Sequence, residues 1–276
     1  MPCRASSGSR PDMSATIEHR GRAIRDPAVL LWTVAGLCWT ATVLLIVLGD
    51  AKLANHDHII EHSSLPWVTK IALFLLIWTV MVGAMMLPTT VRMARLVAVV
   101  SARSPNPTPA RVAMAMSYLA VWAGFGLTAV TFDRGIHFTV DHWPWLSAHS
   151  GLILAGTLGI AGAFQFTSIK DKCLTACRDP VGMLWQHYGR GPMQAWRLGI
   201  RHALNCLGCC WALMLLMFAV GVGGLFWMLM LTAVMVAEKT TRWGHRLVAP
   251  AGVALMVGAA VIATTTMLGH PIAIWH

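Results

Sequence analysis

Residues 203–238 read ALNCLGCCWALMLLMFAVGVGGLFWMLMLTAVMVAE, and the first charged side chain in this stretch is Glu238. A single helix of this length would rise about 1.5 Å per residue and overshoot a hydrocarbon core roughly 30 Å thick. The sequence GVGG at residues 221–224 interrupts the run, and glycine is a poor residue for a helix interior. The stretch therefore predicts two membrane-spanning helices.

Similar apolar runs recur along the whole chain. Apolar residues make up 57% of the 276 residues and charged residues only 12%, whereas an ordinary soluble domain has about 25% charged residues. Runs of about 20 apolar residues between short polar loops have the length of bilayer-spanning helices. The sequence predicts an all-α polytopic transmembrane helical bundle with about seven spans, at residues 28–49, 69–90, 112–132, 149–167, 203–222, 224–238 and 248–268.

Lysine and arginine are concentrated in alternate loops of this bundle. Eighteen of the 21 lie in the N-terminal tail and in three segments, 91–111, 168–202 and 239–247. The loops on the opposite side have only Lys52, Lys70 and Arg134. By the positive-inside rule, this split predicts a cytoplasmic N-terminus, an external C-terminus and an odd number of spans.

The remaining signals fit the same orientation. Residues 1–26 contain five arginines and are rich in Ser and Pro, so we expect a disordered cytoplasmic tail before a single transmembrane domain over 27–276. No small-residue cleavage site follows the first apolar run, so we expect that span to be retained. An outer aromatic belt is expected at Trp67, Trp143, Trp145 and Trp275. We assign the net charge of +10 to membrane orientation and anionic headgroups, and we expect no nucleic-acid partner.

Five of the seven cysteines lie in two short motifs, KCLTACRDP at 172–180 and HALNCLGCCWALM at 202–214. The predicted orientation places both at the cytoplasmic border of the membrane, where thiols stay reduced. Metal ligation is therefore favoured over stable disulfides. In a helix, the second motif places its histidine and three cysteines on one stripe, and an i,i+4 spacing places the two cysteines of the first motif on one face. The candidate metal ligands are Cys173, Cys177, His202, Cys206, Cys209 and Cys210.

Weaker candidate ligands lie near the same border. Met85 and Met86 precede Pro88 in the second span, and Met214 continues the cysteine stripe. Because thiolates and thioethers together select soft ions, Cu(I) is the favoured metal and Zn(II) the second. The spacing is not that of a standard zinc finger. Glu238 could supply an oxygen ligand, although pairing with a nearby basic residue is the commoner role.

A separate group of histidines lies in the first outer loop. His56, His58 and His62 have a plausible spacing for capturing a divalent ion outside the membrane. Solvated histidines in a polar loop commonly bind nothing.

The chain lacks the motifs of common catalytic sites. It has no phosphate-binding P-loop, no G-x-S-x-G elbow and no H-E-x-x-H helix, so we do not expect an enzyme. No charged residue lies in the middle of a predicted span, which argues against a proton-coupled pump. Transport of a soft ion between neutral Met and Cys sites remains an alternative, because it needs no charged residue in the middle of a span.

Four motifs occur in a distinctive order: AMMLP at 84–88, KCLTACRDP at 172–180, HALNCLGCCWALM at 202–214, and Glu238-Lys239. In this combination the chain resembles the bacterial domain-of-unknown-function family described as predicted metal-binding integral membrane proteins. The resemblance covers roughly residues 70–260. It implies a multi-pass, metal-binding protein of the bacterial inner membrane, and it brings no established reaction.

Three hypotheses follow from the sequence. The first is an integral membrane protein that binds a soft metal for delivery, sensing or passage, with a protein partner in metal handling as one option. The second is a membrane thiol-disulfide redox protein that uses Cys209 with Cys210, or Cys173 with Cys177. The third is a structural or assembly subunit in which the cysteines and methionines only pack helices. The sequence does not indicate the oligomeric state.

Overall fold

The computed structural model of the chain describes residues 27–47, 65–102, 107–187, 189, 191–220 and 224–269. Every regular element within these ranges is an α-helix, which confirms the all-α class. The predicted tail, the histidines of the first outer loop and most of the GVGG break lie outside the described residues. The helices are α2 (Pro27–Val47), α5 (Trp67–Ser101), α6 (Thr108–His142), α7 (Pro144–Ala148), α8 (Gly151–Gln165), α9 (Ser168–Arg178), α10 (Pro180–His187), α11 (Pro192–Val220), α12 (Leu225–Thr240) and α13 (Gly244–Met267).

A helix occupies each of the seven predicted spans. Several helices run well beyond the predicted ends. Helix α5 continues to Ser101, α6 continues to His142, and α11 already begins at Pro192. Among the described helices, α2, α5, α6, α11 and α13 are long and apolar enough to cross a membrane. The pair α8 and α9, bent by 65°, would make a sixth span. Because α12 has only 16 residues, the count of seven spans stays a prediction.

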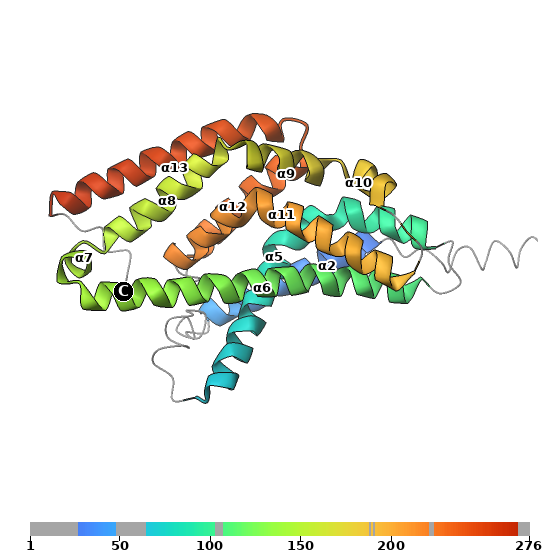
Figure 1. The fold of residues 1–276 in the computed structure, drawn as a ribbon, viewed down its shortest axis with the longest axis horizontal. Helices are drawn as coiled ribbons and strands as arrows, with labels where there is room; N and C mark the ends of the chain where they lie inside the picture. The colour runs from blue at the N-terminus through green and yellow to red at the C-terminus, as the bar shows by residue number, and fades with distance from the viewer. Residues whose placement is uncertain are drawn as a thin grey trace, which may run out of the picture.

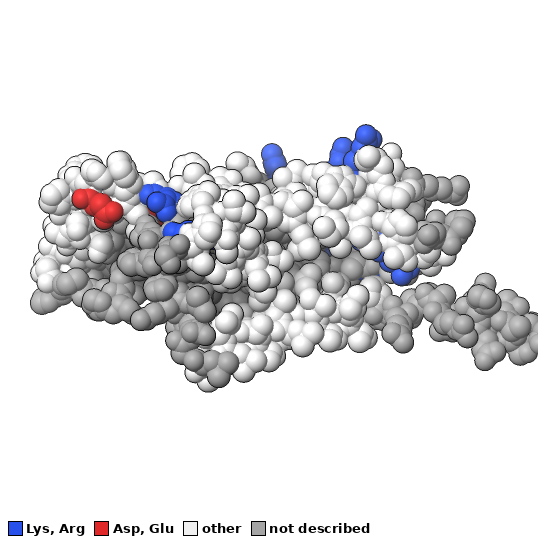
Figure 2. Space-filling model, turned by 90° about the horizontal axis from the view of Figure 1, so that it is seen from below, with Lys and Arg blue, Asp and Glu red and all other residues white. Residues whose placement is uncertain are grey.

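The helix α11 is the centre of the bundle (Figure 1). It packs against α6, α8, α9 and α12, while α2 packs on α5, and α13 packs on α8 at the periphery. The two peripheral helices leave large apolar side chains exposed, among them Val29, Leu30, Val253 and Val257. Uncharged residues make up almost all of the described surface in Figure 2, and the Lys and Arg side chains form a few small groups. A surface of this kind suits contact with lipid.

The helix α5 changes direction in the middle of the molecule (Figure 1). Pro88 lies inside it, and a proline removes the hydrogen bond to the carbonyl four residues earlier. That carbonyl belongs to Ala84, and it accepts a hydrogen bond of 3.1 Å from the indole Nε1 of Trp39 on α2. The bend is therefore stabilised by a neighbouring helix. It places Met85 and Met86 in the fully buried core.

Basic side chains hold the C-terminal end of α12 against two other helices. Arg178 of α9 donates hydrogen bonds to the backbone carbonyls of Glu238, at 2.5 Å, and Thr241, at 2.8 Å. Arg92 of α5 donates to the carbonyl of Thr240 at 2.6 Å. Cations at a helix C-terminus satisfy its free carbonyls and complement its dipole. The end of α12 is therefore firmly placed relative to α5 and α9.

Candidate metal centre

The central helix α11 presents three thiols on its buried side. Cys206, Cys209 and Cys210 are each 1% exposed, and His202, one turn earlier, is 4% exposed. The thiols of Cys209 and Cys210 both donate to the backbone carbonyl of Cys206, at 3.1 and 2.8 Å. The helical repeat thus produces the stripe of side chains that the sequence predicts, and it faces the core.

The short helix α9 brings the first cysteine motif to this stripe. It begins at a bend after α8, where the side chain of Thr167 caps it by accepting a hydrogen bond from the backbone N–H of Lys170. The motif is helical, as the i,i+4 argument requires. The Sγ atoms of Cys177 and Cys209 lie 3.9 Å apart. The two cysteine motifs, far apart in sequence, therefore meet in the fold.

A glycine on α11 allows this close approach. A Cβ atom added to Gly208 would lie 2.6 Å from the Sγ atom of Cys173, which is closer than real Cβ contacts. The missing side chain therefore provides the space that Cys173 occupies, and it lets α9 pack directly on α11.

The bent helix α5 adds a thioether. The Sδ atom of Met86 lies 3.9 Å from the Sγ atom of Cys210. Two sulfur ligands on one tetrahedral metal, with metal–sulfur bonds of about 2.3 Å, are about 3.8 Å apart. Both the Cys177–Cys209 pair and the Cys210–Met86 pair therefore lie at a separation that suits metal ligation.

The described Cys and His side chains are not arranged around one shared metal position. Within the part of the chain that the structure describes, no three side chains of His, Cys, Asp or Glu are arranged so that they could hold a metal ion as they stand. The candidate metal ligands lie close together, and ligation of one ion by three of them requires side-chain movement.

A lysine lies among the same sulfur atoms. The Nζ atom of Lys239, on α12, is 3.0 Å from Cys206 Sγ, 3.7 Å from Cys210 Sγ and 3.8 Å from Met86 Sδ. The lysine is 5% exposed. The sequence marks this residue only as the end of an apolar run, in the motif Glu238-Lys239. Its place beside the sulfur cluster was not predicted. We use this name for the sulfur atoms of Cys177, Cys206, Cys209, Cys210 and Met86.

His202 has no hydrogen-bond partner for either ring nitrogen among the described residues. Its ring stacks on Tyr118 of α6, with ring centroids 5.7 Å apart, and the Tyr118 hydroxyl lies 3.2 Å from Cys206 Sγ. Buried polar groups are nearly always satisfied, so both ring nitrogens of this imidazole are free to bind a further group beside the thiols. Imidazole, thiol and thioether donors together fit a soft transition metal. Tyr118 is a further neighbour that the sequence did not single out.

The carboxylate of Glu238 has the pairing role. Its Oε2 atom accepts a hydrogen bond of 2.8 Å from Lys170 Nζ, and both side chains are buried. The Oε1 atom has no partner among the described residues. The pair joins α9 to α12, next in sequence to the Lys239 that contacts the thiols.

Comparison with known proteins identifies the family. Residues 75–262, more than half of the chain, match the family PpoB2, whose description is copper chaperone. The chain belongs to the PpoB2 family. No curated protein and no solved structure matches it. This match confirms the expectation that the chain belongs to a metal-related family.

The region that matches the PpoB2 family contains all six predicted cysteine and histidine ligands. Met85 and Met214 also fall within it, and both are fully buried in the core that surrounds the thiols. The outer-loop histidines precede the matched region and lie outside the described residues. The family match thus concerns the sulfur cluster and not the outer loop.

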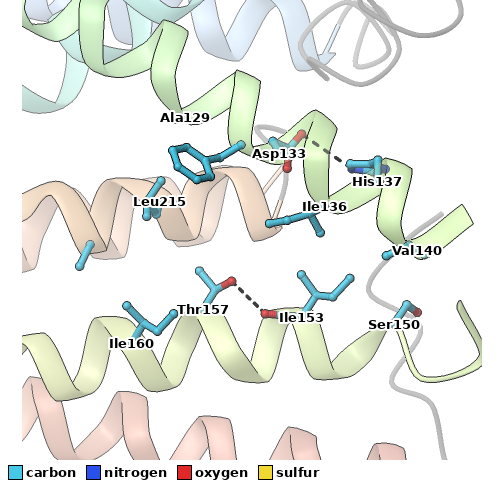
Figure 3. A pocket seen from close by; sticks show the side chains of 12 residues that line it. Ala129, Asp133, Ile136, His137, Val140, Ser150, Ile153, Thr157, Ile160 and Leu215 are labelled. Carbon is cyan, nitrogen blue, oxygen red and sulfur yellow. Dashed lines mark hydrogen bonds and ion pairs between the residues drawn. The ribbon is translucent and has the colours of Figure 1, made fainter. Parts of the chain in front are cut away.

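The part of the chain in the PpoB2 match also lines a partly open pocket of about 460 Å³ between α6, α8 and α11 (Figure 3). Its walls are mostly apolar, and Figure 3 shows Asp133 paired with His137, at 3.7 Å, on its α6 side. Ala212, in its wall, follows Cys209 by three residues. The pocket therefore begins about one helical turn from the thiols.

Proposed function

We propose that this chain is an integral membrane copper chaperone that binds Cu(I) through a buried cluster of sulfur atoms. The cluster consists of Cys177, Cys206, Cys209, Cys210 and Met86, with His202 beside it. The observation that carries the proposal is the meeting of thiols from α9 and α11 with a thioether from α5, in the core of a member of a copper chaperone family.

Ligand softness favours Cu(I) over Zn(II) as the cargo. Thioethers take part in copper sites and hardly in zinc sites, and Met86 lies within 3.9 Å of a thiol. The family description agrees with this choice of metal. Zn(II) is the second candidate.

The graded exposure of the cysteines supports an entry route for the ion on the α9 side. Cys173 and Cys177, on α9, are partly buried, whereas the three cysteines of α11 are buried. We infer that an ion reaches the α9 thiols first and then passes inward to the α11 thiols, since neighbouring sulfur atoms 3.9 Å apart permit exchange of ligands. A protein that donates or accepts copper would dock at the α9 end.

The setting of this activity is also a proposal. The apolar helices, the exposed apolar side chains and the alternation of basic loops support a multi-pass protein of the bacterial inner membrane. The α9 end then faces the cytoplasm. A reducing cytoplasm keeps the thiols available for Cu(I).

Metal analysis of the detergent-purified protein tests the function. We expect stoichiometric Cu(I) in the reduced wild type, and a loss of affinity on the order of tenfold or more in Cys209→Ser and Cys210→Ser, since even changes outside the ligand shell cost that much. Competition with a chromophoric Cu(I) chelator measures the affinity. The matched control is Cys38→Ser, because Cys38 is a partly buried cysteine of α2 outside the cluster. A wild type that binds no metal, or serine variants with unchanged affinity, would remove the proposal.

One distance also favours a second function. The 3.9 Å between Cys177 Sγ and Cys209 Sγ would allow these thiols to form a disulfide in a redox protein, a pairing that differs from those named from the sequence. Differential alkylation separates the two functions. A redox protein shows a reversible Cys177–Cys209 pair, whereas a copper protein shows thiols that become reactive only after a chelator removes the ion.

A further inference from the structure

Lys239 is surrounded by sulfur atoms rather than by carboxylates. Among the described residues its ammonium contacts Cys206 Sγ, Cys210 Sγ and Met86 Sδ, all within 3.8 Å. A buried charge is costly unless an opposite charge or strong hydrogen bonds compensate it. When Cys206 and Cys210 lose their protons to bind a metal ion, their thiolates are the groups placed to compensate this one.

The neighbouring acidic residue does not cancel the lysine. Glu238 is held by Lys170, so this buried pair contributes no net charge beside the cluster. The backbone around Lys239 is clamped by Arg178 and Arg92, which bind the carbonyls on either side of it. The ammonium is therefore a placed positive charge at the sulfur atoms, held there by two other helices.

We propose that Lys239 is a specificity-determining residue, whose positive charge makes the set of Cys206, Cys210 and Met86 prefer a monovalent soft ion over a divalent one. The inference rests on the proposed copper function. With Cys177 and Cys209 kept as neutral thiols, two thiolates, one neutral thioether, one Cu(I) ion and one ammonium sum to zero charge. Zn(II) in the same place leaves a net positive charge in a buried site, where an uncompensated charge is strongly disfavoured.

Charge-removing variants of the full-length protein test this selection. In reduced, detergent-purified Lys239→Gln, we expect the ratio of Cu(I) affinity to Zn(II) affinity to fall by on the order of ten- to a hundredfold, the range of a charge-assisted contact. Lys239→Leu should behave in the same way, while Lys239→Arg, which keeps the charge, should retain the wild-type preference. Lys172→Gln is the matched control, because it removes a positive charge from an exposed position on α9.

Competition with one chromophoric chelator for Cu(I) and another for Zn(II) gives both affinities for each variant. The proposed selection is overturned if the ratio of Cu(I) affinity to Zn(II) affinity is unchanged in Lys239→Gln and Lys239→Leu. This holds when both metals bind as in the wild type. It also holds when both metals are lost equally, since equal loss means that the lysine only supports the fold. These results leave the copper function standing. A wild type without Cu(I) binding instead removes the copper function itself.

Discussion

At the scale of single residues, two adjacent methionines on α5 allow metal ligation to be distinguished from packing by substitution. Met85 and Met86 are both fully buried, but it is Met86 whose sulfur lies 3.9 Å from Cys210 Sγ. A leucine in either position keeps the apolar volume and removes only the thioether. The pair therefore provides a variant and its control in the same turn of helix.

We expect Met86→Leu to lower the affinity for Cu(I) by on the order of tenfold and to leave the Zn(II) affinity nearly unchanged, because thioethers contribute to copper sites. Met85→Leu should change neither value. Chelator competition on the purified variants measures both. Equal affinities for Cu(I) in the two leucine variants would show that Met86 only fills space.

His202 and Lys239 show how far single residues can be understood from the sequence. His202 lies four residues before Cys206, so helical periodicity places it correctly on the cysteine stripe. A lysine at the end of an apolar run is instead expected to extend toward water. Lys239 lies in the core because α12 ends against α5, α9 and α11, and no local pattern contains that information.

At the scale of helices, the contact between α9 and α11 assembles the cluster. Gly208 has no side chain where Cys173 lies, so the two helices approach closely enough for Cys177 to reach Cys209. A β-branched residue at Gly208 must push α9 away, because the added atoms would overlap Cys173.

We expect Gly208→Val to slow the oxidative cross-linking of Cys177 to Cys209 severalfold and to weaken Cu(I) binding. Mass spectrometry after a mild oxidant follows the cross-link. Gly156→Val is the control, because an added Cβ at this exposed glycine of α8 meets nothing within 4 Å. A cross-linking rate in Gly208→Val equal to that of the control would contradict this account of the helix contact.

At the scale of the whole molecule, the basic segments gather at one end of the bundle. Lys170 and Arg178 of α9 and Arg92 of α5 all contact the end of α12, and Arg111 of α6 donates to the carbonyl of Ala98 near the end of α5. Arg134 lies instead over the ring of Trp67, in the segments expected on the opposite side. The arrangement is compatible with the predicted sidedness.

The predicted topology has a direct test. We expect a reporter that is active only outside the cytoplasm to be active when fused after His276, and a reporter that fluoresces only in the cytoplasm to fluoresce when fused before Met1, since 18 of 21 basic residues lie in the segments expected on the inner side. Reversing the two fusions provides the control. A C-terminus inside the cell would mean an even number of spans and a different place for α12.

The sequence by itself determined the helical class, the presence of a helix in each apolar run and the cysteine stripe on α11, but not where several of the helices end. These features depend on hydrophobic run length and on the 3.6-residue repeat, which are local properties of a chain. The tertiary structure decided that Cys177 meets Cys209, that Met86 rather than Met85 lies at Cys210, and that Lys239 lies among the thiols. Those contacts depend on the bend at Pro88, the gap at Gly208 and the clamped end of α12, and only the packing of several helices sets them together.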